Sequence, residues 1–270
     1  MALVNKIIPF SCIDGPGNRT AIFFQGCNFN CTYCHNPETI NKCFNCGKCV
    51  KVCPVEALEV NDKSIKWKEE KCISCDACIR ECDKNSTPKT KDYSVDELFE
   101  EIKKVSPFIQ GITVSGGECT LNAEFLVELF RRVKNELNLT CFADTNGSID
   151  LTKYEELVEV TDKFMVDIKS IDEEEHIKIT GLSNKVVLDN IKYLLDKDKI
   201  YEVRTVIAPN LNNEKTVKEV SKIIKDKCKY KFNPYRIHGV RKEGLELHGN
   251  RNLSNEDVAY LRKFIDKNEE

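Results

Sequence analysis

The sequence lacks an excess of either charge. Its 41 basic and 44 acidic residues nearly cancel and leave a formal net charge of −3. Lys and Arg are scattered along the predicted helices and form no block. A protein that binds nucleic acid through its phosphates needs a basic patch or stripe. The composition therefore argues against a nucleic-acid partner.

Long apolar runs are missing as well. The longest, such as 21–24 (AIFF) and 163–168 (KFMVDI), are far shorter than the roughly 20 apolar residues of a membrane-spanning helix. The first residues also lack the charged, apolar and small-residue regions of a signal peptide. From these absences we expect no membrane association and a cytoplasmic protein.

Cysteine, in contrast, is abundant, with 15 residues in a chain of 270. An odd number without an export signal makes a disulfide framework a poor explanation, and metal ligation a better one. Eleven cysteines form three spaced groups: Cys27, Cys31 and Cys34; Cys43, Cys46, Cys49 and Cys53; Cys72, Cys75, Cys78 and Cys82. Because free cysteine is often buried, we expect the other four to be buried or partly buried: Cys12, Cys119, Cys141 and Cys228.

Most of the chain alternates between strand and helix patterns. Short β-rich runs occur at 20–26, 111–117, 140–147, 163–170, 201–209 and 229–237. Apolar residues with helical spacing occur at 94–105, 122–137, 152–160, 184–197, 214–227 and 255–267. Six such units predict an α/β fold, a partial (β/α)6 barrel whose functional residues lie at the carboxyl ends of parallel strands.

A cysteine-dense segment interrupts this alternation. Residues 38–92 lack long periodic stretches, so we expect them to form an insert and residues 1–37 and 93–270 to form the barrel. The runs CFNCGKCVKVCP and CISCDACIRECD both read CxxCxxCxxxC, the spacing of bacterial two-cluster ferredoxins. We therefore expect a ferredoxin-like α+β domain with two 4Fe-4S clusters.

In that arrangement the fourth cysteine of each run binds the other cluster. This assigns Cys43, Cys46, Cys49 and Cys82 to one cluster, and Cys72, Cys75, Cys78 and Cys53 to the second. A pair of structural zinc sites is the alternative, although four cysteines this close together are unusual for zinc. Asp83 stands where the first run has Pro54 and puts a charge near one cluster.

The remaining group, CxxxCxxC, follows the first predicted barrel strand. Cys27, Cys31 and Cys34 provide three thiolates, one fewer than a closed four-cysteine cluster requires. A 4Fe-4S cluster bound this way has one iron free for a substrate, as a catalytic zinc site keeps one open position. The alternative is a closed cluster completed by Cys119 or Cys141.

The segment CNFNCTYCHNP resembles the signature of radical S-adenosylmethionine (SAM) enzymes, and SCIDGPGNRTAIFFQGCNFNCTYCHNP is similar to the start of glycyl-radical-enzyme activating enzymes. The resemblance covers nearly the whole chain, with GGE, DTNG and DxK following in order. The insert is typical of the larger activating enzymes. The resemblance implies a radical SAM barrel that cleaves SAM reductively to a 5′-deoxyadenosyl radical. This radical takes a hydrogen from a glycine of a partner glycyl radical enzyme.

The resemblance also implies a set of site residues. The catalytic cysteines are Cys27, Cys31 and Cys34. The residues expected to contact SAM are Tyr33, Gly116, Gly117, Glu118, Asp144, Asp167, Lys169 and Arg204. The residues of an implied monovalent cation site beside the SAM carboxylate are Asp144, Thr145, Met165 and Asp167. On the residues alone, Met165 fits the core better than a cation site, and Lys169 and Arg204 fit the surface as well as they fit the cofactor pocket.

Partner contacts follow from the same resemblance. The glycine loop of the partner is expected to dock beside Asp14, Gly15, Gly17 and Cys34. Where relatives carry a histidine after the aromatic residue of the last strand, this chain has Arg236, with His238 two positions later. We expect a monomer reduced by a flavodoxin or a ferredoxin-type protein, with three 4Fe-4S clusters in all. Two alternatives remain: a radical SAM enzyme for a small molecule, and an electron-transfer ferredoxin fused to a non-catalytic barrel.

Overall fold

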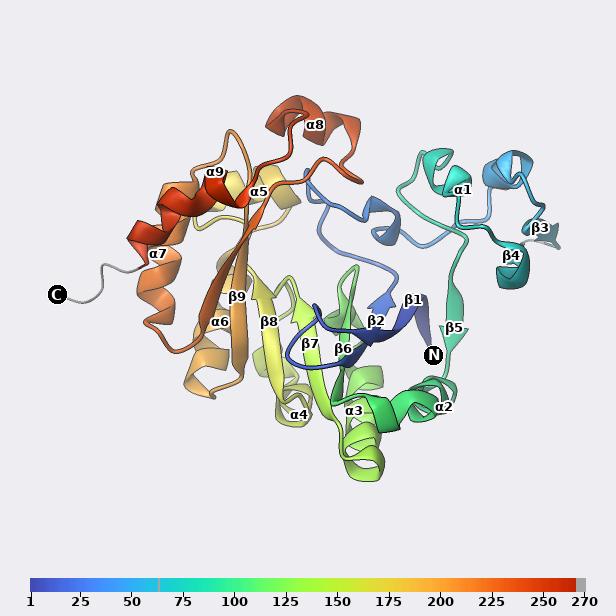
Figure 1. Ribbon diagram of the computed structural model, residues 1–270, viewed down its shortest axis with the longest axis horizontal. Coiled ribbons are helices and arrows are strands. Elements are labelled where there is room, and N and C mark those ends of the chain that lie inside the picture. Colours follow the sequence, from blue (N-terminus) through green and yellow to red (C-terminus); the bar gives the residue numbers. More distant parts are fainter. Residues whose placement is uncertain (63, 266–270) are drawn as a thin grey trace.

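A computed structural model describes residues 1–62 and 64–265 of the chain. Its centre is a sheet with strand order β10-β9-β8-β7-β6-β2-β1-β5 (Figure 1). The parallel strands are β2 (Arg19–Phe24), β6 (Gly111–Gly116), β7 (Thr140–Thr145), β8 (Lys163–Asp167), β9 (Ile200–Ile207) and β10 (Lys229–Pro234). These are the six predicted strands. Because β10 and β5 lie at opposite edges of the described sheet, the barrel is partial, as expected.

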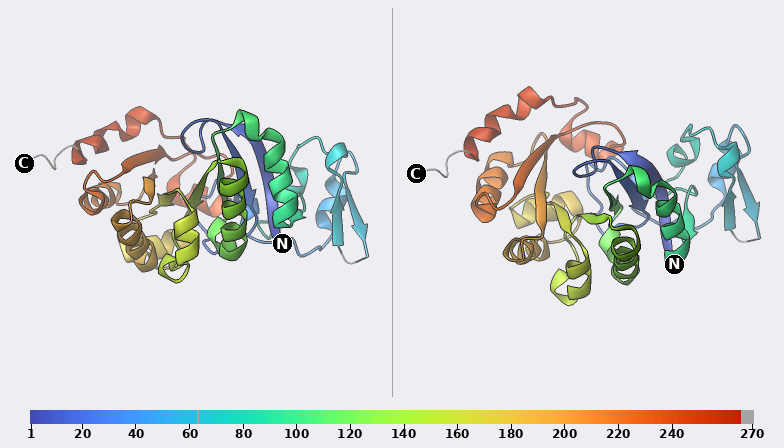
Figure 2. Two further views of the ribbon diagram at one scale, coloured as in Figure 1. Left: turned by 90° about the horizontal axis from the view of Figure 1, so that it is seen from below. Right: turned by 60° about the horizontal axis from the view of Figure 1, so that its bottom comes forward.

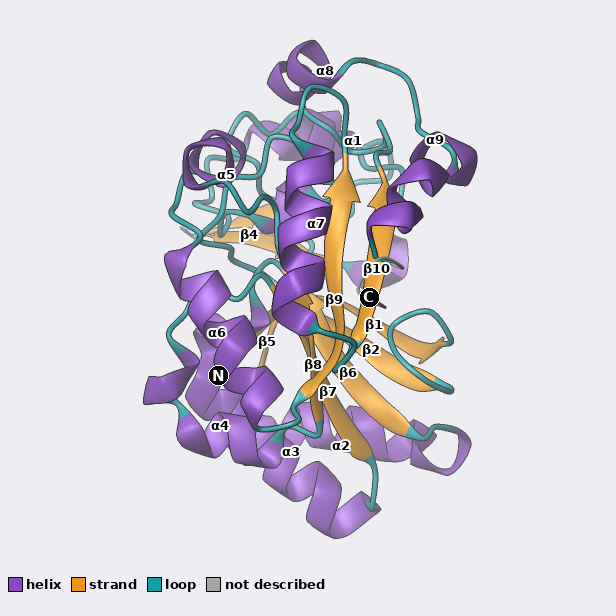
Figure 3. Cartoon of the chain, turned by 90° about the vertical axis from the view of Figure 1, so that its left-hand side faces the viewer, coloured by secondary structure: helices purple, strands orange, loops and turns teal. Residues whose placement is uncertain are grey.

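Helices connect the parallel strands and cover the outer face of the sheet (Figure 3). They are α2 (Val95–Val105), α3 (Ala123–Leu137), α4 (Glu155–Val160), α6 (Lys185–Asp196) and α7 (Asn213–Ile224). The sixth predicted helix, 255–267, is shorter: α9 (Asn255–Ala259) continues as the 3-10 helix η7 (Tyr260–Phe264). Its last two predicted residues, 266 and 267, lie outside the described residues, as does the rest of the predicted barrel segment to 270.

Outside the insert, four of the described strands and α-helices were not predicted. Two strands, β1 (Ala2–Ser11) and β5 (Lys91–Tyr93), extend the sheet beyond β2. β1 pairs with β2 in antiparallel orientation, and β5 pairs with β1 in the same way. Two helices, α5 (Glu173–Thr180) and α8 (Lys242–His248), lie above the carboxyl ends of the strands (Figure 1). Both helices have at most eight residues, so their sequences hold little more than two turns of periodic pattern.

The two faces of the sheet differ in chemistry. On the outer face, Ile22, Phe24 and Ile112 pack against Leu126 and Phe130 of α3 in the main hydrophobic core. Burial of each such side chain contributes about 1.5 to 3 kcal/mol. This asymmetry gives the sheet one apolar face that binds the helices, and one concave polar face.

A buried arginine, the last residue of the DGPGNR segment, stabilises the lower part of the concave face. Arg19 is 1% exposed. It donates hydrogen bonds to Thr113 Oγ1 (2.8 Å), Thr140 Oγ1 (2.9 Å) and the Ile112 carbonyl (2.6 Å), and its guanidinium lies 4.2 Å from the ring centre of Phe142. The side chain thus joins β2, β6 and β7 below the strand ends.

The cysteine-dense segment projects from the side of the sheet near β1 and β5 (Figures 1 and 2). It contains the hairpin β3 (Leu58–Asn61) and β4 (Ser64–Trp67), the short helix α1 (Ala77–Arg80), and a small core of Cys49, Leu58 and Cys78. The chain rejoins the large sheet through β5. A ferredoxin-like domain over 38–92 remains a prediction, and its residue 63 lies outside the described residues. Among the described residues, no helix has both the length and the apolar character needed to cross a membrane.

Candidate functional site

The CxxxCxxC loop leaves the carboxyl end of β2 and is fixed by backbone hydrogen bonds. The Cys27 amide donates to the Ile40 carbonyl (2.9 Å), and the Asn30 and Thr32 amides donate to carbonyls at the end of α5 (2.8 and 2.9 Å). Arg241, next to α8, donates to the carbonyls of Asn30 and Cys31 (3.1 and 2.9 Å). The two unpredicted helices therefore help to position the predicted catalytic loop.

The three thiols of this loop are half-buried. Burial raises the pKa of Cys27 to about 11 and that of Cys31 to about 12, and the nearby Lys169 opposes the shift. Cluster binding requires thiolates, which the positive charge of Lys169 favours. In addition, Asn146 Nδ2 lies 3.7 Å from Cys27 Sγ as a hydrogen-bond donor. The donor set fits a thiolate-bound cluster, which the loop would hold through Cys27, Cys31 and Cys34.

Two glycines, Gly116 as the last residue of β6 and Gly117 directly after it, let the strand end approach this loop. A Cβ on Gly116 would lie 2.3 Å from the Phe24 nitrogen, and one on Gly117 would lie 2.2 Å from the Gly26 carbonyl oxygen. Gly116 also has a φ of 113°, which other residues rarely adopt. Only glycine fits at either position, so this segment presents bare backbone at the carboxyl end of the sheet.

Glu118 joins the ends of two strands. The side chain is 1% exposed, and it accepts hydrogen bonds from Thr145 Oγ1 (2.7 Å), the Asn146 amide (2.7 Å) and the Thr120 amide (3.0 Å). Burial raises its pKa, while these donors oppose the shift. Because the donors engage both carboxylate oxygens, Glu118 stabilises the β6 and β7 ends. Its expected contact with SAM remains a prediction.

Four charged side chains from three strands form a network at the centre of the site. Arg204 Nε donates to Asp167 Oδ1 (2.9 Å), Arg204 Nη2 pairs with Asp144, and Lys169 Nζ lies 2.8 Å from Asp167 Oδ2. Their side chains are 12 to 25% exposed, so Lys169 and Arg204 are not surface charges. A fifth charged side chain, Glu202, lies with Oε1 3.9 Å from Arg204 Nη1, so three carboxylates face two cations in this network.

The two carboxylates of the network differ in acidity. Burial alone would raise the pKa of Asp167, but Arg204 and Lys169 overcome it and hold the value at about 2. Burial raises the pKa of Asp144, and the charge of Asp167 adds to the rise while Arg204 opposes it. This divergence is typical of two carboxylates that share one site.

The residues of the predicted cation site lie at adjacent strand ends. Asp144 of β7 is in register with Met165 of β8. Met165 is 1% exposed, and the Thr145 hydroxyl donates to Glu118. The guanidinium of Arg204 contacts both carboxylates and supplies a positive charge there. A monovalent cation at this place remains a prediction.

The predicted docking segment lies lower on the concave face. Asp14, Gly15 and Gly17 belong to the loop between β1 and β2, and the Asp14 carbonyl accepts a hydrogen bond from Thr113 Oγ1. Ser115 lies two residues after Thr113 on β6, and its hydroxyl donates to Asp144 Oδ2 (3.0 Å). The segment is thus connected to the charged network through one strand, while its role toward a partner remains a prediction.

A buried histidine that sequence reasoning missed contacts the cysteine loop. Arg236 and His238, considered from the sequence, are both exposed. His248, at the end of α8, is 1% exposed, with Nδ1 3.0 Å from the Pro209 carbonyl and Nε2 2.9 Å from Thr32 Oγ1. Because a carbonyl only accepts, Nδ1 donates and Nε2 accepts from Thr32. The surrounding segment, GLELHGN, contains no motif that marks His248 as a site residue.

Tyr33, between two of the loop cysteines, is largely covered by protein. Its side chain is 3% exposed in a cluster with Ile179, Tyr235 and Val240. The ring packs edge-on against His248, with ring centres 5.4 Å apart. Its hydroxyl is buried and has no hydrogen-bond partner among the described residues. Contact with adenine remains a prediction.

Of the four cysteines outside the three spaced groups, three are buried or partly buried, as predicted. Cys119 and Cys141 are buried and Cys228 is half-buried, but Cys12 is exposed, so its predicted burial is wrong. Cys12 lies in the loop between β1 and β2, where nothing covers a small side chain. The Cys119 thiol donates to the Asp144 carbonyl (3.2 Å), and Cys141 packs in the main core.

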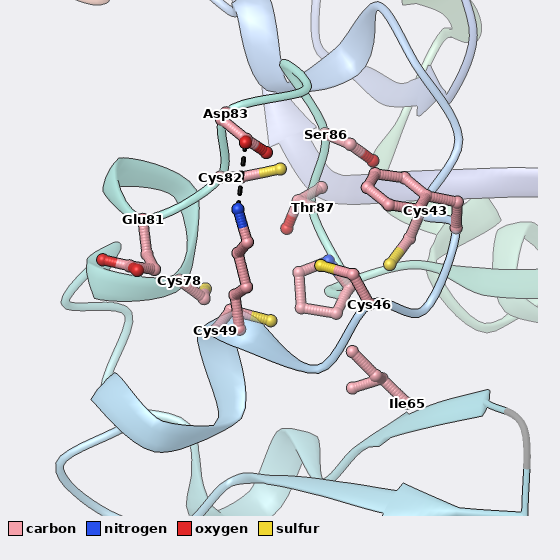
Figure 4. A pocket seen from close by; sticks show the side chains of 13 residues that line it. Cys43, Cys46, Cys49, Ile65, Cys78, Glu81, Cys82, Asp83, Ser86 and Thr87 are labelled. Atoms are coloured by element: carbon pink, nitrogen blue, oxygen red, sulfur yellow. Dashed lines mark hydrogen bonds and ion pairs between the residues drawn. The ribbon is translucent and has the colours of Figure 1, made fainter.

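The eight insert cysteines line two pockets. Cys43, Cys46, Cys49 and Cys82 line one (Figure 4), and Cys53, Cys72 and Cys75 line the other, while Cys78 borders both. This is the grouping that the ferredoxin spacing predicts. Asp83 pairs with Lys48 (3.0 Å), so its charge beside the first pocket is partly compensated.

The thiols around each pocket stand apart from one another. Among the described residues, no three His, Cys, Asp or Glu side chains lie close enough to hold a single metal ion. A zinc ion needs thiolates about 2.3 Å from one point. A 4Fe-4S cluster carries its thiolates on separate irons. The choice between zinc sites and 4Fe-4S clusters in the insert remains a prediction.

The geometry defines a class of protein: a partial α/β barrel with a three-cysteine loop above its parallel strands. The profile of the radical SAM superfamily matches residues 21–223, and the chain belongs to that superfamily. Streptococcus suis SuiB bound to its precursor peptide SuiA has a similar fold, with a TM-score of 0.54 and 10% identity over 89% of this chain and 43% of that one.

Within this superfamily, curated relatives show that the chain belongs to the glycyl-radical-enzyme activating enzymes. The trans-4-hydroxy-L-proline dehydratase activating enzyme of Clostridioides difficile is 33% identical over 82% of this chain and 78% of its own. The pyruvate formate-lyase-activating enzyme of Streptococcus mutans is 31% identical over 88% and 78%. The choline trimethylamine-lyase activating enzyme of Oleidesulfovibrio alaskensis is 28% identical over 98% and 95%.

Proposed function

We propose that this protein activates a glycyl radical enzyme by removing a hydrogen atom from a glycine of that partner. The observation that carries this proposal is the CxxxCxxC loop, which is held over the strand ends that bear Glu118, Asp144 and Asp167. The curated relatives favour it over chemistry on a small molecule. When bound, a 4Fe-4S cluster with one open iron supplies the electron for reductive cleavage of SAM.

The residues of the chain position the cofactor and exclude water. Gly116 and Gly117 let the end of β6 pack closely against the end of β2 and the cysteine loop, and their backbone would line the methionine part of SAM. Lys169 and Arg204 would supply positive charge near its carboxylate. Asp144 and Asp167 balance these cations and set their orientation. Such preorganisation keeps reacting atoms within contact range, which is the main contribution of a protein to cofactor chemistry.

The target of the radical is testable by isotope transfer. A peptide spanning the glycine of a candidate partner, with deuterium on its α-carbon, is incubated with the reduced enzyme and SAM. We expect deuterium in 5′-deoxyadenosine, and none when alanine labelled at the same carbon replaces the glycine. Transfer from a labelled small metabolite, and from no glycyl-radical-type peptide, would establish the small-molecule alternative.

We also propose that the insert binds two clusters and passes electrons inward from a flavodoxin or a ferredoxin-type reductant. The segment 38–41 contacts the catalytic loop through Thr39 and Ile40, and Asn41 pairs with Ser86 beside the first pocket. The Cys43 pocket is therefore connected to the active site by hydrogen bonds. On this proposal the protein is a cytoplasmic, anaerobic monomer with three clusters.

Iron content and turnover test the insert. We expect about 12 iron atoms per chain after anaerobic reconstitution, three clusters of four. Replacing Cys46 or Cys75 by Ala removes about four of them and slows multiple turnovers with a protein reductant, while binding of SAM is unchanged. Unchanged turnover in both variants would instead make the insert structural. Stoichiometric zinc would contradict the cluster assignment.

A further inference from the structure

Each insert pocket contains one buried hydrogen-bond donor with no partner. The Ser86 hydroxyl lies beside the Cys43 pocket, and the serine is 1% exposed (Figure 4). The indole Nε1 of Trp67 is buried beside the Cys53 pocket. Among the described residues, seven buried side-chain polar atoms lack a partner, and two of the seven lie in these two pockets.

An unpartnered buried donor is costly, at about 1 to 3 kcal/mol for each group. Water is a poor partner here, because it needs two to four polar contacts and much of the surrounding surface is apolar. Phe44, Ile65 and Pro88 line the first pocket, and Leu58 and Ile73 line the second. Carboxylates also line the pockets, Glu81 and Asp83 in the first and Asp76 in the second, but none of them accepts from Ser86 or Trp67. The acceptor type that several residues of both pockets share is cysteine sulfur.

Backbone amides already show that sulfur accepts hydrogen bonds here. The Asn45 amide donates to Cys43 Sγ (3.4 Å) in the first pocket, and the Ala57 amide donates to Cys53 Sγ (3.2 Å) in the second. Each pocket thus has one backbone donor in use and one side-chain donor still free. A cluster held by the thiols brings sulfur acceptors into both pockets.

We infer that Ser86 and Trp67 each donate a hydrogen bond to a sulfur of the cluster in their own pocket and raise its reduction potential. The inference rests on the two insert clusters of the proposed function. A reduced cluster carries one more negative charge than the oxidised cluster, so a donor stabilises the reduced form more. The two residues are positioning residues that tune electron affinity without ligating iron.

The test uses reconstituted enzyme and redox titrations followed by electron paramagnetic resonance. Trp67→Phe keeps an aromatic ring and removes only the donor-bearing part, and Ser86→Ala removes only the hydroxyl. We expect each variant to reduce the equilibrium constant for reduction of one insert cluster by about tenfold, a shift of about 59 mV for one electron. The affected cluster differs between the two variants. Tyr193→Phe, which removes another unpartnered buried hydroxyl, leaves all three potentials unchanged.

A second measurement begins with the unmodified enzyme. In the unmodified enzyme, each reduced insert cluster is expected to show coupling to an exchangeable proton that disappears after exchange into D2O. Trp67→Phe and Ser86→Ala each remove one such coupling. Two further outcomes are distinct: unchanged potentials and couplings at about 12 irons overturn this inference alone, whereas about four irons in the unmodified enzyme overturn the insert clusters themselves.

Discussion

Replacing Cys31 by Ala is expected to abolish production of 5′-deoxyadenosine. The loop provides three thiolates, and two are too few to retain a 4Fe-4S cluster with an open iron. Iron should fall from about 12 to about 8 atoms per chain, because the insert pockets draw on other cysteines. Anaerobic reconstitution, iron analysis and chromatographic detection of 5′-deoxyadenosine measure both effects.

Two other cysteines serve as controls for this experiment. Cys12→Ala alters an exposed thiol outside the three groups and should change neither iron nor rate. Cys119→Ala tests the closed-cluster alternative, because a fourth ligand at this position would cost iron when removed. The Cys119 thiol donates to a backbone carbonyl, so we expect full iron content. Parental rates in Cys31→Ala would show that the catalytic site lies elsewhere.

Replacing Arg204 by Met is expected to produce a large loss of stability. The guanidinium pairs with Asp144 and Asp167, and its removal leaves buried carboxylates without their main partner. Breaking a buried ion pair in this way lowers the free energy of unfolding by about 3 to 5 kcal/mol. In a chain of this size the apparent Tm falls by roughly 10 °C. Anaerobic thermal unfolding, followed by circular dichroism, measures the shift.

A matched surface pair provides the control. Arg131 pairs with Glu156 at 2.9 Å, but both side chains are more than half exposed. Exposed pairs contribute about 0 to 1 kcal/mol, so Arg131→Met should shift Tm by no more than about 3 °C. Arg204→Lys keeps the positive charge but loses the planar guanidinium that reaches two carboxylates. Its Tm should therefore lie between those of the unmodified protein and Arg204→Met. Equal shifts for Arg204→Met and Arg131→Met would contradict a buried network.

The sequence predicted the parallel strands well because they are short β-rich runs bounded by turn residues, although β9 (IYEVRTVI) and β10 (KYKFNP) also contain charged residues. It missed β1, whose run ALVNKIIPFS contains Pro9 and does not alternate strictly, and the helices α5 and α8, which are too short to show a clear period. The site residues that carry motifs were found. Asn146 lies in the DTNG motif, but its contact with Cys27 depends on the fold. His248 lies in no motif, and no local spacing marks its contact with the cysteine loop.

The two segments that join the insert to the barrel are themselves paired. Asn41 donates from its amide to the Asn85 carbonyl (3.1 Å) and from its side chain to the Lys84 carbonyl (2.9 Å), and it forms a β-bridge with Ser86. The entry and exit points of the insert therefore lie side by side. Insertions are best tolerated where the ends of the added segment meet. The bridge between Asn41 and Ser86 is parallel, so a replacement for the cysteine-rich segment would have to be a crossover connection of roughly a dozen residues or more and not a short turn. A foreign redox module of that kind could be grafted at the same two points.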